Sequence, residues 1–140
     1  MVKKEKQKFV ITWGKRKSSV ARAVAKPGSG KITINSIPLE TWGTEINRMK
    51  VTEPLILAGD ASKKVDIEVN VRGGGTTGQA DAARMAIANA LVQFFKDENL
   101  KRKFLDYDRN LLVADARRPE PRKPSRSKKG ARRHKQRSKR

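Results

Sequence analysis

The sequence contains no cysteine among its 140 residues. Disulfide bonds and thiolate metal sites are therefore excluded. Long apolar runs are absent too: the longest, such as Leu111–Ala114, fall far short of the roughly 18–20 residues that a membrane-spanning helix needs. Only a short apolar stretch follows the first lysines, so no secretory signal is predicted. We expect a cytoplasmic protein with no membrane partner.

Aromatic residues are also scarce, at 5% of the chain. Their spacing forms no platform on which successive bases would stack, so we expect any nucleic acid to be recognised by its backbone and shape. The one histidine, His134, lies among cations and has no cysteine or second histidine with which to share a metal. We therefore expect no enzymatic activity, no metal or other cofactor, and no small-molecule substrate.

Acidic residues are few and unevenly distributed. The chain has 14 Asp and Glu against 34 Lys and Arg, a formal net charge of +20. Charge of this size suits a polyanionic partner. Residues 117–140 hold 13 of the cations and one acid, Glu120, with Ala131 as the only apolar side chain. So little apolar surface cannot offset the entropy of ordering, and this segment should be disordered in isolation.

This distribution divides the chain into three parts. Residues 1–8 form a basic amino-terminal arm, residues 9–116 form a folded body, and residues 117–140 form an extended polycationic tail. At about 3.3 Å per residue, the tail could extend roughly 80 Å into a folded polyanion. A folded surface has no comparable reach.

Four segments of the body have the composition and alternation of β-strands. They are residues 9–13, 20–25, 31–35 and 65–72. The last is the clearest, because four β-branched residues alternate with four polar ones, as in a strand with one buried face. We expect residues 14–17 to form the turn between the first two strands.

Three segments are predicted to be helical. Residues 44–58 should form two short pieces, because Pro54 lacks the N–H that a helix interior needs. Residues 79–96 carry apolar side chains at helical spacing, and Asp81 in the first turn would interact favourably with the helix dipole. A third helix covers residues 99–107. The body is thus an α+β fold, a small sheet with helices packed on one face.

The run GGGTTGQA (73–80) follows the clearest strand and leads into the second helix. Gly73 and Gly78 have the spacing of a nucleotide-binding P-loop, but Gln79 and Ala80 stand where that motif needs Lys and then Ser or Thr. A nucleotide-hydrolysing enzyme is therefore not supported. Two interpretations of the glycines remain: a turn that needs positive φ angles, or bare amides that accept a phosphate of a polynucleotide.

Predicted contacts to a nucleic-acid backbone gather around two turns of the body and along the tail. In the body they are Lys15, Arg16, Lys17, Arg22, Arg72, Gly73, Gly74, Gly75, Gln79 and Arg84. In the tail they are Arg117, Arg118, Arg122, Lys123, Arg126, Lys128, Lys129, Arg132, Arg133, Lys135 and Arg137. Each charge that neutralises a phosphate would add to the salt dependence of binding.

Four blocks of the sequence resemble blocks of one family, ribosomal protein nine of the small ribosomal subunit. They are GKRKSSVARA (14–23), GKITINSIPLE (30–40), GGGTTGQADAARMAIANAL (73–91) and LLVADARRPEPRKPSRSKKGARRHKQRSKR (111–140). Stretches such as EPLILAGD (53–60) are closer to the archaeal and eukaryotic branch. The blocks cover most of the chain in the right order.

The resemblance implies a fold like the second domain of ribosomal protein five, a sheet with helices on one face and a left-handed crossover. It also implies a structural role in the head of the small subunit, bound to ribosomal RNA and to neighbouring ribosomal proteins. The tail would run through that RNA towards the peptidyl site, where Lys139 and Arg140 would contact the anticodon stem-loop of transfer RNA. Lys139 stands where many archaeal and eukaryotic relatives have Tyr.

A chromatin-like DNA-binding protein is the main alternative, because a basic, histone-like arm binds DNA without sequence preference. The two hypotheses differ in where the protein is found. Nearly all of a ribosomal protein would sediment with small subunits.

Overall fold

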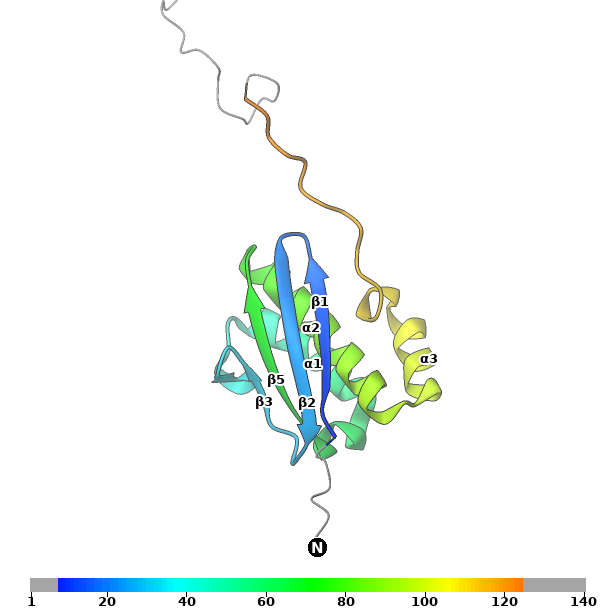
Figure 1. The fold of residues 1–140 in the computed structure, drawn as a ribbon. Helices are drawn as coiled ribbons and strands as arrows, with labels where there is room; N and C mark the ends of the chain where they lie inside the picture. Colours follow the sequence, from blue (N-terminus) through cyan, green and yellow to red (C-terminus); the bar gives the residue numbers. More distant parts are fainter. Residues whose placement is uncertain (1–7, 125–140) are drawn as a thin grey trace, which may run out of the picture.

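Residues 8–124 are described by the structure, a computed structural model of the chain (Figure 1). Five strands form one sheet in the spatial order β1-β2-β5-β3-β4. Their bounds are Val10–Arg16 (β1), Ser19–Pro27 (β2), Ile32–Ile34 (β3), Ile37–Pro38 (β4) and Val65–Arg72 (β5). Neighbouring strands are antiparallel except for β3 and β5, which are parallel.

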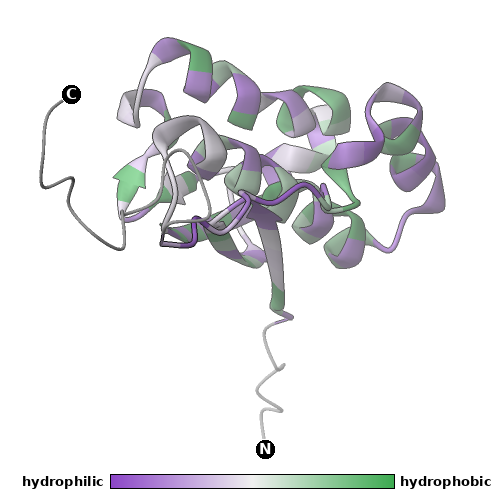
Figure 2. Cartoon of the chain, turned by 90° about the horizontal axis from the view of Figure 1, so that it is seen from above, coloured by the Kyte–Doolittle hydropathy of each residue, from purple (hydrophilic) through white to green (hydrophobic). Residues whose placement is uncertain are grey.

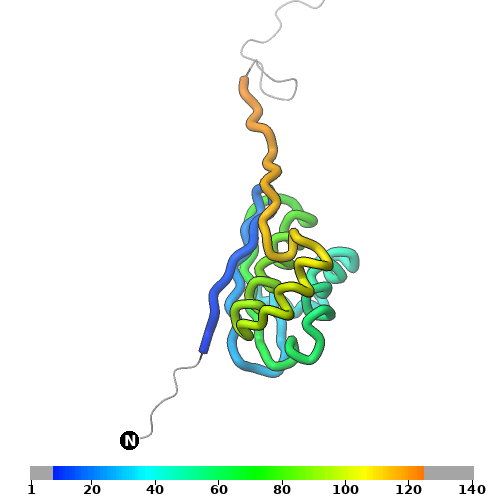
Figure 3. Tube along the Cα trace, turned by 90° about the vertical axis from the view of Figure 1, so that its right-hand side faces the viewer, coloured from blue at the N-terminus to red at the C-terminus, as the bar shows by residue number. Residues whose placement is uncertain are grey.

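Helices cover one face of this sheet and leave the other face open (Figure 3). They are α1 (Glu45–Ala58), α2 (Thr76–Phe95) and α3 (Glu98–Tyr107), with short 3-10 turns at Leu39–Thr41 (η1), Gly59–Lys64 (η2) and Arg109–Leu111 (η3). The predicted α+β arrangement is confirmed. Within the described part of the chain, no helix is both long and apolar enough to cross a bilayer.

Small side chains bring α2 close to the sheet. Alternate residues of β2 point at the helix and are fully buried: Ala21, Ala23 and Ala25. Helix α2, which packs against both the sheet and α1, is rich in buried alanines, namely Ala80, Ala82, Ala83, Ala86, Ala88 and Ala90. Burying this apolar layer supplies the main stabilisation of the body.

The connection from β3 to β5 runs through α1, on the helical side of the sheet. Seen from the open face with both strands pointing up, β3 lies to the left of β5 and α1 lies behind them (Figure 1), so the crossover is left-handed. Most connections between parallel strands have the opposite hand. The structure thus has the crossover that the family resemblance implied.

The first hairpin turns later than the sequence analysis predicted. Gly14, Lys15 and Arg16 continue β1, and the turn falls at Lys17 and Ser18. Gly14 remains in the strand because it packs against the backbone of α2, where a Cβ atom would lie 2.7 Å from the amide nitrogen of Ala86. The tight contact between strand and helix extends the pairing through Arg16.

The two helical pieces predicted around Pro54 are one helix, α1. Pro54 is buried, together with Asn47 and Val51, on the face of α1 that packs against α2. The proline removes one backbone hydrogen bond, and tertiary packing of this face outweighs that loss.

Helix α2 begins three residues earlier than predicted, at Thr76, with Gly75 as its N-cap residue. Asp81 therefore lies beyond the first turn, which contains no acidic residue. Its carboxylate instead accepts a hydrogen bond from Lys50 Nζ at 3.3 Å, which ties α2 to α1. The expected role of Asp81 at the helix dipole was wrong.

Past η3, residues 114–124 form neither helix nor strand. They leave the body at the end of the sheet where β1 and β2 turn, opposite to the end where the described chain begins (Figures 1 and 3). Figure 2 views the molecule from above, from the end where residues 114–124 leave the body, and shows these residues to be mostly hydrophilic. The boundary at residue 117 between body and tail remains a prediction.

Candidate nucleic-acid interface

The glycine loop after β5 lies against the β1–β2 hairpin. Gly73 and Gly74 have φ angles of +78° and +66°, a region that other residues rarely adopt. A Cβ atom on Gly73 would lie 2.6 Å from the carbonyl oxygen of Ser18, and one on Gly74 would clash with Ser19 Oγ. Ser19 Oγ donates a hydrogen bond to the Gly73 carbonyl at 2.9 Å. These two glycines are therefore required by the turn and by its contact with the hairpin.

Gly75 is different from its two neighbours. Its φ is −94°, and a Cβ atom placed on it would meet nothing within 4 Å. The turn and the packing of the described chain leave this position free for a side chain. The space above Gly75 is open to a molecule that approaches from outside.

A hollow lies at the amino-terminal end of α2. It is lined by Lys17, Ser18, Ser19, the residues from Gly74 to Gly78, and Pro119. The first intrahelical bond runs from the Gln79 amide to the Gly75 carbonyl at 2.9 Å, and no side chain caps the helix. Within residues 8–124, the amides of Thr76, Thr77 and Gly78 thus have no hydrogen-bond acceptor. Such free amides carry the positive end of the helix dipole and suit an anion.

Gln79, a predicted RNA contact, stabilises the glycine loop through a side-chain hydrogen bond. Its Nε2 donates a hydrogen bond to the Gly73 carbonyl at 3.2 Å. Gly73 O thereby accepts bonds from both Ser19 and Gln79. The side chain holds the loop in its turn, half-buried beside the hollow.

Two predicted cations, Arg22 and Arg72, lie on the open face of the sheet. They line a second hollow together with Val20 and Asn70. Both arginines are exposed, and within the described chain neither has a carboxylate partner. Lys17 at the hairpin tip is exposed as well, and Lys15 is half-buried at the same end of the sheet.

Two other predicted contacts, Arg16 and Arg84, point inward. Arg84 is 15% exposed, and its guanidinium lies between Glu53 of α1, which it contacts through Nη2, and Asp108, whose Oδ2 is 3.1 Å from Nη1. Arg16 is 18% exposed, with Nη1 3.2 Å from Asp115 Oδ2. Both side chains have partners within the protein, which the sequence pattern did not reveal because those partners are distant along the chain.

Asp115 holds the start of the extended segment against the body. Its carboxylate lies beside Arg16 of β1 and accepts hydrogen bonds from the side chain and the amide of Arg117. The side-chain hydrogen bond with Arg117 is the main cause that holds the pKa of Asp115 far below its ordinary range, and the same contact raises the pKa of Arg117. Arg118 Nη1 donates to the Asp115 carbonyl at 2.8 Å.

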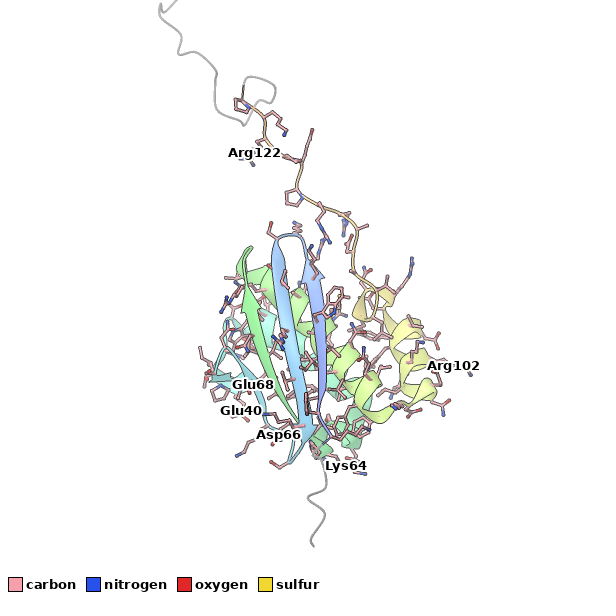
Figure 4. All side chains as sticks on the ribbon, viewed as in Figure 1. Glu40, Lys64, Asp66, Glu68, Arg102 and Arg122 are labelled. Atoms are coloured by element: carbon pink, nitrogen blue, oxygen red, sulfur yellow. The ribbon has the colours of Figure 1, made fainter. Side chains whose placement is uncertain are left out.

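The remaining predicted tail contacts form two groups, those within the described residues and those outside them. Arg122, at the outer part of the described segment (Figure 4), is exposed, as is Lys123. The others lie outside the described residues: Arg126, Lys128, Lys129, Arg132, Arg133, Lys135, Arg137, Lys139 and Arg140.

Trp13, the most exposed aromatic residue of the described chain, was not among the predicted contacts. Trp13 is 65% exposed on the open face of β1, directly opposite Arg22 of β2. The signal was in the alternation of the strand, since Thr12 and Gly14 face the helices and Trp13 must face the other way.

Comparison with known proteins assigns the chain to a family. The family model for ribosomal protein S9/S16 matches residues 14–140. The small ribosomal subunit protein uS9 of Methanococcus maripaludis is 53% identical over 131 residues, which cover 94% of this chain and 98% of the relative. The uS9 protein of Picrophilus torridus is 51% identical over 116 residues, covering 83% and 87% of the two chains. The chain therefore belongs to the ribosomal protein S9/S16 family, and it is a structural, non-enzymatic component of the small ribosomal subunit in the cytoplasm.

Proposed function

We propose that this protein binds ribosomal RNA in the head of the small subunit through one end of its body, and that its tail reaches the transfer RNA in the peptidyl site. The observation that carries the proposal is the hollow at the start of α2, which combines three amides without acceptors in the described chain with Lys17 and the open position Gly75. A backbone phosphate fits this chemistry, because helix amino termini bind anions through free N–H groups.

The cations near this hollow support the same assignment. Lys17 lies at its rim, and Arg72 directly precedes the glycine loop. Pro119 also lines the hollow, so the tail starts beside it. Hairpin, glycine loop and tail thus present their positive charges at one end of the molecule, where a single folded RNA can contact all three.

Arg16 and Arg84 receive a different role in this proposal. The ion pair of Arg16 with Asp115 fixes the start of the extended segment to β1, and those of Arg84 with Glu53 and Asp108 tie α2 to α1 and to the end of α3. They act on RNA binding by holding the binding surface in place, and the exposed Lys17, Arg22 and Arg72, with the half-buried Lys15, make the contacts.

Neighbouring ribosomal proteins would use a different surface. Three large apolar side chains of α1 are exposed, namely Ile46, Met49 and Ile56. Apolar groups of this size gain free energy from contact with a protein surface and gain little from phosphates. The outer side of α1 therefore suits a protein neighbour in the subunit head.

The glycine loop provides the first test. Gly73→Ala should lower the free energy of unfolding by about 2 kcal/mol, because alanine is strained at positive φ and meets the Ser18 carbonyl. Gly75→Ser should change it by less than about 0.5 kcal/mol, since serine is a good N-cap residue, yet it should weaken binding to small-subunit ribosomal RNA roughly tenfold by filling the phosphate position. Urea unfolding and filter binding measure the two effects. Unchanged RNA affinity for Gly75→Ser would exclude a phosphate at this position and leave Gly73 and Gly74 with a role in the turn alone.

The tail provides the second test. Deletion of residues 138–140 removes Lys139 and Arg140 and should leave assembly of the subunit intact, because the body and most of the tail charge remain. Binding of transfer RNA at the peptidyl site should weaken several-fold, as expected for the loss of two charged phosphate contacts. Truncated and intact subunits can be compared by filter binding of initiator transfer RNA. Equal affinities would exclude the tail tip from this contact.

A further inference from the structure

The open face of the sheet carries two ordered rows of side chains at its hairpin end. Strand register places Trp13, Arg22 and Asn70 side by side across β1, β2 and β5. The next row towards the hairpin contains Lys15, Val20 and Arg72. Directly opposite residues are about 5 Å apart, so each row spans the three strands without a gap.

Within residues 8–124, no other part of the chain covers the Trp13 side chain. Its indole is 65% exposed, whereas Trp42, the other tryptophan of the chain, is 8% exposed within the core. Next to Trp13, a hollow lined by Val20, Arg22, Asn70 and Arg72 offers two guanidiniums, an amide and an apolar floor. A large aromatic surface therefore lies beside a polar, positively charged depression.

The far end of the same face has the opposite character. Glu68 stands opposite Val24, and Asp66 stands opposite Lys26; both acids lie away from the hairpin end (Figure 4). Asp66 accepts hydrogen bonds from the amides of Ser29, Gly30 and Lys31, so its charge is used within the protein. The free cations of the open face are concentrated around Trp13, at the end that continues into the glycine loop.

We propose that this row is a nucleotide-binding site, in which an unstacked base of RNA lies on the Trp13 indole while Arg22 and Arg72 bind its phosphate and the Asn70 amide faces the base edge. The inference rests on the proposed function and adds the class of RNA: a single-stranded loop, bulge or end. A-form duplexes keep their base faces stacked, so they cannot use an aromatic platform. The expectation of backbone and shape recognition alone is thereby replaced at this face.

RNA is favoured over a protein partner by the charge of the site. A protein partner would have to bring carboxylates to both guanidiniums, while each RNA nucleotide brings one phosphate and one aromatic base together. The site is also continuous with the glycine loop, because Arg72 directly precedes Gly73. One RNA strand can therefore pass from the hollow of α2 onto the sheet.

Tryptophan fluorescence tests the proposal in the full-length chain. A Trp42→Phe background makes Trp13 the only tryptophan, so its emission can be excited selectively over that of Tyr107. A single-stranded 12-nucleotide oligoadenylate should quench and shift this emission, and a 12-base-pair RNA duplex should bind without doing so. Replacing Trp13 by leucine in the wild-type background should weaken oligoadenylate binding by roughly five- to 100-fold, the range measured for loss of base stacking, and should leave duplex binding within about twofold.

The arginines are tested against a matched control on the same strand. Arg22→Gln should raise the midpoint of Trp13 quenching and reduce the log–log salt slope by about 0.7, the value for one phosphate of a single strand. Lys26→Gln removes an equal charge from the same face at its acidic end. It should leave the midpoint unchanged within about twofold. Equal effects of the two variants would mean that only general charge matters, and would overturn the site.

Failure of this inference can be told apart from failure of the proposed function. If labelled oligoadenylate and duplex both bind by fluorescence anisotropy while Trp13 emission stays constant, RNA binding stands and the nucleotide site is excluded. If neither RNA binds, the proposed function fails. In intact small subunits, p-benzoylphenylalanine at position 13 should crosslink to ribosomal RNA. Crosslinks to protein alone would overturn the proposal and identify the face as a protein interface, whatever the folding of the Trp42→Phe variant.

Discussion

Arg84 and Arg22 carry the same group in opposite surroundings. Arg84 lies on the helical side of the sheet, 15% exposed, between the carboxylates of Glu53 and Asp108. Arg22 lies on the open side, exposed and without a carboxylate partner in the described chain. On the helical side the positive charge stabilises the fold, and on the open side it is available to a ligand.

The difference teaches how a chain with 34 basic residues can both fold and bind RNA. Self-repulsion opposes compaction in such a chain. Acidic residues on the helical side, among them Asp81 and Asp115 with their lysine and arginine partners, neutralise the charges that must be close together. The hairpin end and the open face keep exposed cations, which RNA would neutralise under the proposed function.

The largest expected effect is a difference in the free energy of unfolding between the Arg84 and Arg22 variants. Arg84→Gln should lower the free energy of unfolding by about 2 kcal/mol, less than for a fully buried pair because Glu53 and Asp108 are partly exposed. Arg22→Gln should change it by less than about 0.5 kcal/mol, as for a surface substitution. Urea unfolding of the two variants measures both. The different roles assigned to the two arginines would be contradicted if Arg84→Gln kept the stability of the unmodified protein and lost as much RNA affinity as Arg22→Gln.

A smaller effect is expected at the start of the extended segment, where Asp115 pairs with Arg16 of β1 and with Arg117. Asp115→Asn removes the ion pairs with Arg16 and Arg117, so the extended segment should lie less often beside the hollow of α2. Because the chain has no cysteine, a spin label on a Pro119→Cys variant is unique. It should broaden the amide signal of Gly75, and the broadening should decrease in the Asn variant.

The pH dependence of this contact follows from the direction of the pKa shift. The pKa of Asp115 is held below its ordinary value near 3.8, so the contact is fully present above that value and is lost only as the pH falls through the lower folded-state pKa. The broadening of Gly75 should therefore persist from pH 7 down to about pH 4. A loss between pH 7 and pH 5 would contradict the assignment to Asp115.

Local patterns of the sequence were sufficient for most elements. The alternation in residues 65–72 predicted β5 with its bounds, and the spacing of apolar residues predicted α2 and α3 to within a few residues. Errors arose where a tertiary contact opposed a local preference. Gly14 stays in a strand because α2 packs on it, and Pro54 stays in a helix because its face is buried.

The candidate site was predicted as a set of basic residues together with the glycine loop and Gln79, and only the structure divided that set. Glycine spacing excluded a P-loop, but it could not tell Gly73 and Gly74, which the turn requires, from Gly75, which it does not. Trp13 was not predicted as a contact because the few aromatic residues of the chain are not spaced as a base-stacking platform. Its neighbours on the site, Arg22 and Asn70, come from other strands.

The sequence by itself determined the charge, the α+β class and the family, because composition, periodicity and motif order are local properties. The division into body and tail stays a prediction from the same composition. Tertiary structure decided which cations remain free. Arg16 and Arg84 meet carboxylates at short range, while Arg22 and Arg72 share an open face with Trp13. The strength of an ionic contact depends on distance and burial, and both are fixed only when segments far apart in the chain are brought together.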